Sequence, residues 1–148
     1  MERPHVLAID FGTSNSYFSL CHSDQLFPSG INLRSDRAGM HTAILYREGG
    51  TPLVGYEAVE EWLNASDVDR KSYHLRTHFK PDIISNQEAF ADTKNFLEIT
   101  RKQLEQAHVV SDPRKLHVII GVPSEFGKPY NDRLCEVAEL AGYGRIQT

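Results

Sequence analysis

The sequence lacks the phosphate-binding patterns of two common nucleotide folds. It contains no GxxxxGK[ST] loop and no GxGxxG fingerprint, so nothing supports a P-loop or a dinucleotide-binding site. No apolar run approaches the ~20 residues that a membrane-spanning helix needs. The N-terminal stretch MERPHVLAID lacks the apolar region of a secretory signal. We therefore expect a cytoplasmic protein without a membrane partner.

Cysteine and clustered positive charge are also scarce. The two cysteines, Cys21 and Cys135, belong to no CxxC pair, which disfavours a zinc site and indicates free thiols. The net charge is −4, and the chain contains no run of Lys or Arg. Because a nucleic-acid-binding surface needs clustered positive charge, we expect no nucleic-acid partner.

What is present is typical of one globular domain. The chain has 148 residues, of which 40% are hydrophobic and 24% charged. A compact chain of this length buries about 68–70% of its unfolded surface, which is enough for a substantial core.

Apolar periodicity predicts strands near both ends of the chain, two helices in its middle and one helix before the last strand. The run LHVIIGVP, Leu116 to Pro123, predicts a strand buried on both faces. Asn64–Ile84 has no clear periodicity. Because helices alternate with strands in the second half, we expect an α/β fold with a mixed sheet. The other expected strands are His5–Asp10, Asn15–Cys21, Gln25–Phe27, Ala43–Tyr46, Leu53–Val54 and Gly144–Gln147, and the expected helices are Tyr56–Leu63, Asn86–Ala107 and Pro129–Ala141.

The segment AIDFGTSNSYFSL, Ala8 to Leu20, is the most informative part of the chain. It predicts an apolar strand ending in Asp10, a tight turn, and a second strand of alternating pattern. Gly12 lets the backbone approach a ligand oxygen closely, and Thr13, Ser14 and the turn's N–H groups can bind an anion. Asp10 can orient a hydrated magnesium ion, which needs few protein ligands. The alternative is an ordinary hairpin, because Asp, Gly, Ser and Asn are common turn residues.

Two distant segments resemble one protein superfamily. AIDFGTSNS resembles the first phosphate loop of the actin, sugar-kinase and heat-shock ATPase superfamily. VIIGVPSEFGKPYNDRLCEVAELAGYGRI resembles a segment of the seventy-kilodalton heat-shock chaperones, in which a strand ending in Val122-Pro123 precedes Phe126 and a helix ending in Ala141-Gly142. The stretch from Arg37 to Trp62 resembles the part of those chaperones between them.

The resemblance implies a ribonuclease-H-like fold, as in the actin-like ATPases. It predicts a mixed five-stranded sheet into which a small α/β subdomain is inserted. Residues 1–32 and 114–148 would form the sheet subdomain, and residues 33–113 would form the insertion.

The resemblance also implies the nucleotide chemistry of that superfamily, with ATP and Mg²⁺ as cofactors. Asp10 would act through metal-bound water, and Thr13 would bond the γ-phosphate. Gly12, Thr13, Ser14 and Asn15 would contact the nucleotide. The chaperones' basic pair, which includes a catalytic Lys, has no clean match here. Lys71, Arg76 and Lys80 are the candidate cations, and the alternative is that all three are solvated surface charges.

The chain would then be the N-terminal part of a chaperone-like ATPase that binds protein clients or co-chaperones. The second phosphate loop and the adenosine loop would lie beyond Thr148. We therefore expect the 148-residue chain to bind ATP weakly and not to hydrolyse it at a family-like rate. We also expect one sheet face to expose parts of Val118, Ile120 or Ile146, and to cause weak homo-oligomerisation. The alternatives are a fragment of a small-molecule, sugar-type kinase of the same superfamily or a non-catalytic binding module.

Overall fold

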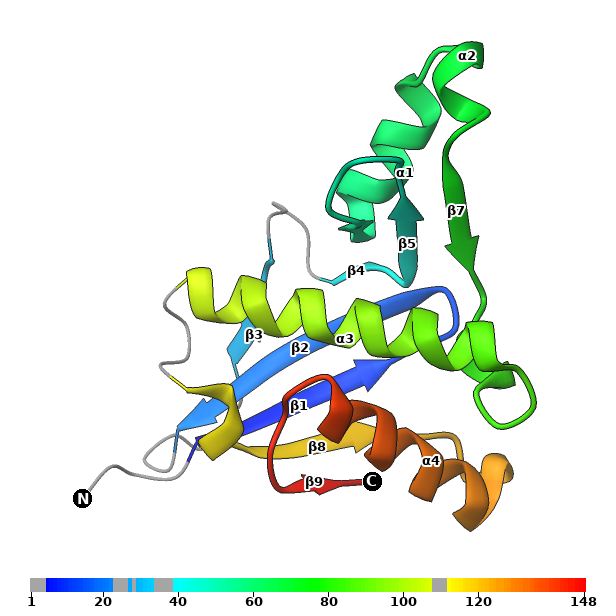
Figure 1. Ribbon diagram of the computed structural model, residues 1–148. Coiled ribbons are helices and arrows are strands. Elements are labelled where there is room, and N and C mark those ends of the chain that lie inside the picture. The colour runs from blue at the N-terminus through cyan, green and yellow to red at the C-terminus, as the bar shows by residue number, and fades with distance from the viewer. Residues whose placement is uncertain (1–4, 23–26, 28, 34–38, 108–111) are drawn as a thin grey trace.

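The computed structural model describes residues 5–22, 27, 29–33, 39–107 and 112–148. Their strands form two sheets (Figure 1). In the larger sheet the strand order is β3-β2-β1-β8-β9, and a short strand β4 also pairs with β2. β1 is antiparallel to β2 and parallel to β8, so the predicted α/β fold with a mixed sheet is confirmed. The bounds are β1 His5–Phe11, β2 Asn15–His22, β3 Ser29–Ile31, β4 Met40–His41, β8 His117–Gly121 and β9 Ile146–Gln147.

The smaller sheet comes from the middle of the chain. Its order is β6-β5-β7, with both pairs antiparallel. Helix α1 packs on β5 and β6. The segment that lacked a clear sequence pattern forms α2, β7 and a short 3-10 turn, Lys80–Asp82. The bounds are β5 Ala43–Tyr46, β6 Leu53–Val54, α1 Gly55–Asn64, α2 Asp67–Arg70 and β7 His74–Thr77.

Two long helices cover one face of the larger sheet (Figure 1). They are α3, Gln87–Gln106, and α4, Gly127–Leu140. The Asn86 side chain caps α3 by accepting hydrogen bonds from two backbone N–H groups at its start. Buried side chains of α3 and α4 form one core with the inward-facing side chains of β1, β2 and β8. Short 3-10 turns, Pro113–Lys115 and Ser124–Phe126, flank β8.

Glycine sets the end of α4. Gly142 has φ 97°, and its N–H donates to the Glu139 carbonyl at 2.9 Å. The Tyr143 N–H donates to the Ala138 carbonyl at 3.2 Å. These two hydrogen bonds, around a glycine in the left-handed conformation, form a Schellman motif. The predicted stop at Gly142 is confirmed, whereas the helix begins at Gly127 rather than at Pro129.

The other face of β8 is open, which corrects two predictions. Burial alternates along the strand, so β8 is not buried on both faces. Val118 and Ile120 are fully buried under the helices, and Ile119 is 44% exposed. Of the three side chains predicted to be exposed, Val118 and Ile120 are therefore wrong, whereas Ile146 in β9 is partly exposed. The error arises because a continuous apolar run carries no alternation from which to read the covered face.

Two further boundaries differ from the sequence predictions. The expected strand Gln25–Phe27 lies mostly outside the described residues, and the structure has β3 at Ser29–Ile31 instead. The last strand begins at Ile146 rather than at Gly144. The division of the chain at residues 33 and 113 stays a prediction. Among the described helices, none is long and apolar enough to cross a membrane.

Candidate functional site

The turn between β1 and β2 forms a closed loop. The two strands pair up to Phe11 and Ser16, so Gly12–Asn15 make the connection. A Cβ on Gly12 would lie 2.2 Å from the Asn15 carbonyl oxygen, a separation that no side chain tolerates. Only glycine therefore fits this backbone. Thr13 is half-buried, whereas Ser14 and Asn15 are exposed.

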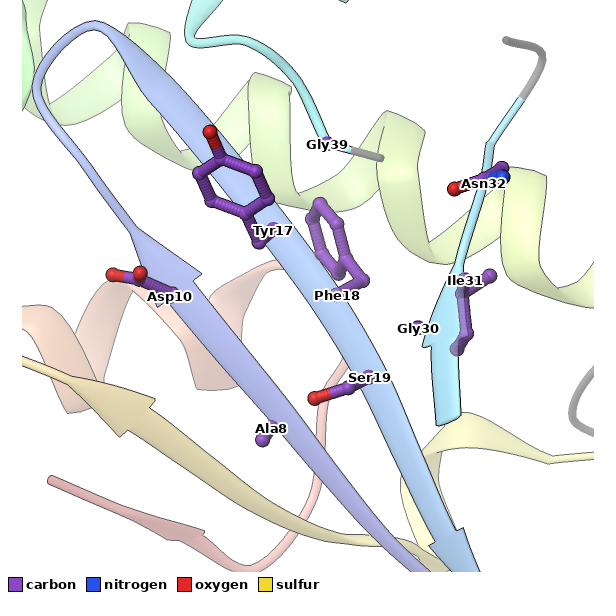
Figure 2. Close-up of a pocket in the computed structure, with 9 residues that line it drawn as sticks. All are labelled: Ala8, Asp10, Tyr17, Phe18, Ser19, Gly30, Ile31, Asn32 and Gly39. Carbon is purple, nitrogen blue, oxygen red and sulfur yellow. The ribbon is translucent and has the colours of Figure 1, made fainter. Parts of the chain in front are cut away.

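Asp10 lies near the end of β1 on the open face of the sheet. Side chains alternate along a strand, so Asp10 and Ala8 point away from the face that buries Ile9 and Phe11. Asp10 and Tyr17 are among the residues that line a pocket of about 180 Å³, and Figure 2 shows both side chains. In the parallel neighbour β8, Gly121 is the residue paired with Asp10.

Lys80 is buried directly under the loop. The residue is only 3% exposed, and its Nζ donates a hydrogen bond to the Phe11 carbonyl. The same ammonium lies 5.4 Å from the centre of the Phe11 ring, within the range of a cation–π contact. The Tyr130 hydroxyl donates to the Lys80 carbonyl at 2.9 Å and holds this backbone.

Burial and a nearby carboxylate act on the Lys80 ammonium in opposite directions. Desolvation lowers the pKa of Lys80 because it penalises the charged form. The negative charge of Asp10 raises it, but by less. The net result is a pKa below the ordinary value.

The structure places the other two candidate cations away from the loop. Arg76 Nε donates to Asp92 Oδ2 at 2.9 Å, and its Nη2 donates to Glu88 Oε2 at 3.1 Å. Lys71 is exposed at the C-cap of α2, just before β7, whereas the loop lies toward the opposite end of that strand (Figure 1). Of the three candidates, only Lys80 contacts the backbone beside the loop.

Arg76 instead belongs to a polar network between β5, β7 and α3. The Tyr46 hydroxyl donates to Asp92 Oδ1 at 2.8 Å and accepts from Asn95 Nδ2 at 3.0 Å. Burial, together with the Asp92 carboxylate, raises the pKa of Tyr46 to about 12. This network ties the smaller sheet to α3.

Thr42 is a site residue that sequence reasoning missed. It is the single residue between β4, which pairs in the larger sheet, and β5, which belongs to the smaller one. Its Oγ1 donates to the Gly12 carbonyl at 2.8 Å, and its N–H donates to the Ser14 carbonyl at 2.9 Å. The hydroxyl oxygens of Ser16 and Thr42 lie 2.7 Å apart. No local signal marks Thr42, because its partners lie about thirty residues earlier.

A second pocket, of about 150 Å³, lies between the loop and the smaller sheet. Thr13 and Ser14 line its loop side, and Thr42, His41 and His78 line its other sides. His78 has φ 55°, a left-handed conformation that is uncommon outside glycine. It is the residue that follows β7.

No group of three or more His, Cys, Asp or Glu side chains that could hold a metal ion occurs in the described part of the chain. Magnesium does not require such a group, because it keeps several of its waters and takes one or two carboxylates with substrate phosphates. The exposed Asp10 beside two hydroxyl-bearing loop residues is compatible with that mode of binding.

Comparison with known proteins supports the fold. The chain matches no protein-family model and no curated protein. Among solved structures, MreB5 of Spiroplasma citri bound to ADP is similar at a TM-score of 0.65 and 14% identity. The AMPPNP complex of MreB5 gives 0.64 at 15% identity, and a non-polymerising MamK mutant bound to AMPPNP gives 0.60 at 17%.

These matches cover 99% of this chain but only 38–41% of the neighbours' length. The chain therefore spans less than half of an MreB or MamK chain. At this level of identity the likeness shows the fold, and the fold is that of the actin-like ATPases.

Proposed function

We propose that the chain supplies the first phosphate-binding loop of an ATP-binding actin-like ATPase. The observation that carries the proposal is the loop itself. Gly12 closes against the Asn15 carbonyl, Asp10 stands exposed at the preceding strand, and the buried ammonium of Lys80 is bonded to the carbonyl between them. A carboxylate, a cation and two hydroxyls thus surround one short turn.

Each group has a role that follows from its chemistry. Thr13 and Ser14 donate hydroxyl and backbone hydrogen bonds to phosphate oxygens. Asp10 orients the water shell of a magnesium ion. Lys80 supplies fixed positive charge near the phosphates, where positioning and electrostatics do most of the work in phosphoryl transfer. Asn15 contacts the nucleotide from the end of the turn.

The solved neighbours support the nucleotide, because they are bound to ADP or AMPPNP. The segment from Val118 to Ile146 supports a chaperone-type parent with protein clients or co-chaperones, through its resemblance to the heat-shock ATPases. We propose the chaperone-type ATPase as the parent on that resemblance, ahead of the sugar-type kinase.

The test is a titration of the 148-residue chain with Mg·ATP, monitored through backbone amide resonances. We expect weak binding that shifts the amides of Gly12–Asn15, because the chain spans less than half the length of its nucleotide-bound neighbours. Mg·AMP should leave these amides unchanged, since the loop recognises the terminal phosphates. An equal response to Mg·AMP would argue against a phosphate loop.

Two variants sharpen this test. Asp10→Asn should weaken the response only when magnesium is present. The matched control is Asp67→Asn on exposed α2, which removes the same charge at a distance from the loop. If both variants respond alike, net charge rather than the Asp10 position governs binding.

A further inference from the structure

The Thr42 side chain can form only one arrangement of hydrogen bonds. A hydroxyl has a single proton, and the Gly12 carbonyl, 2.8 Å away, can only accept. The Thr42 proton therefore points at Gly12. Ser16 must then donate its own proton to Thr42 Oγ1 across the 2.7 Å contact. Ser16 and Thr42 are 0% and 1% exposed, so water does not compete for these bonds.

The backbone of Thr42 adds a third link to the same turn. Its N–H donates to the Ser14 carbonyl at 2.9 Å. Thr42 thereby bonds to the carbonyls on both sides of Thr13. Strand pairing holds the ends of the turn, where Phe11 pairs with Ser16 and Asn15 pairs with His41. The bonds from Thr42 hold the carbonyls between those ends.

The position of Thr42 in the chain gives these bonds their meaning. It is the only residue between β4 in the larger sheet and β5 in the smaller sheet. After β7 the chain leaves the smaller sheet at His78, whose φ is 55°. Two residues later, the Lys80 ammonium donates to the Phe11 carbonyl. Both connections between the sheets are thus tied to carbonyls of Phe11–Ser14.

We infer that Thr42 is a positioning residue that couples the phosphate loop to the smaller sheet. A displacement of the Gly12 and Ser14 carbonyls also displaces Thr42, which directly precedes β5. Binding of a ligand to the loop therefore changes the position of β5, β6 and β7. This inference rests on the proposed function only for the identity of the ligand that occupies the loop.

The test uses the 148-residue chain with Mg·ATP as the probe. Thr42→Val keeps the shape of the side chain and removes the hydroxyl, whereas Thr42→Ser keeps the hydroxyl. The control Thr51→Val makes the same chemical change at an exposed position between β5 and β6. In the parent chain, Mg·ATP should shift amides of the loop and of β5. Thr42→Val should keep the loop shift and lose the β5 shift, whereas the other two variants should behave like the parent.

Several results would overturn the inference. A β5 shift that survives in Thr42→Val would show that coupling runs elsewhere. Loss of the shift in Thr42→Ser as well would show that the hydroxyl is not the link. A parent chain whose loop responds while β5 stays silent would show that the two are not coupled.

A measurement without nucleotide separates this inference from the proposed function. The residue-42 amide donates to the Ser14 carbonyl, so its hydrogen exchange reports how firmly the loop is held. Thr42→Val should speed this exchange roughly tenfold relative to core amides of β1, because it leaves buried polar groups unpaired. Thr42→Ser should not. If Mg·ATP gives no response at all but exchange behaves as expected, the proposed function fails and the positioning role stands. Unchanged exchange in Thr42→Val rules that role out.

Discussion

Replacing Lys80 by methionine should stabilise the protein at neutral pH. The ammonium has three donors, yet the Phe11 carbonyl is its one hydrogen-bond acceptor among the described residues, and the residue is 3% exposed. Methionine has a similar length and no charge, and it would pack against the Phe11 ring. Replacing a buried ion pair with apolar groups of similar volume is often stabilising by about 1–4 kcal/mol, and the Lys80 ammonium has no ion-pair partner among the described residues to offset its desolvation. Losing the bond to Phe11 offsets part of this gain, so we expect about 2 kcal/mol.

The gain should be measurable in both chemical and thermal unfolding. For a chain of this size, 1 kcal/mol shifts Tm by about 2–4 °C, so Lys80→Met should melt about 4–8 °C higher. The matched control is Lys71→Met, which makes the same change at an exposed position. Its effect should stay within about 0.5 kcal/mol. A Lys80→Met protein that is less stable than the parent at pH 7 would refute the burial argument.

The pH dependence gives an independent check with a definite sign. Burial lowers the pKa of Lys80 below its ordinary value of 10.5. Between the folded and unfolded pKa values the unfolded chain binds more protons, so the Lys80 contribution to stability rises with pH. The difference in the free energy of unfolding between Lys80→Met and the parent should therefore become smaller as the pH approaches 10.5. Burial raises the pKa values of Tyr130 and Tyr143, so their contribution to stability falls above pH 10. This loss is the same in both proteins and cancels in the stability difference between them.

Three other substitutions test the loop, the core and the open face. Gly12→Ala places a Cβ 2.2 Å from the Asn15 carbonyl oxygen. It should destabilise by about 1–3 kcal/mol in urea unfolding and abolish the Mg·ATP response. Phe96→Ala removes a fully buried ring that stacks on Phe11 at 5.9 Å, and should cost about 3–5 kcal/mol by the same assay. Ile119→Lys should abolish any self-association seen by sedimentation with little loss of stability, because Ile119 is 44% exposed.

The β1–loop–β2 unit was predictable because its determinants are local. Inward and outward residues alternate in β2, and the residues of the turn are those that tight turns favour. The same holds for α3, whose apolar stripe and Asn86 cap are contiguous in the sequence. The predicted bounds of these elements are correct to within one residue.

The site beyond the loop was not predictable in the same way. Lys80 bonds to a carbonyl 69 residues earlier, and Thr42 to one 30 residues earlier. Neither residue has a neighbouring pattern that distinguishes it from a surface Lys or a loop Thr. Their roles arise because the chain leaves the larger sheet at Thr42 and comes back beside β1 at Lys80, in the 3-10 turn before α3. Only the paired topology of the two sheets brings them to the same turn.

The open sheet face places two predicted features next to each other. In the parallel register of β1 and β8, Ala8 pairs with Ile119 and Asp10 pairs with Gly121. Asp10 and Ile119 therefore lie two residues apart along the sheet, about 7 Å in strand rise. A second copy of the chain that covered Ile119 would thus crowd the carboxylate proposed to orient magnesium. Self-association through this face and binding of Mg·ATP should then oppose each other. Sedimentation with and without Mg·ATP should show weaker association in its presence, and equal association would place any dimer contact elsewhere.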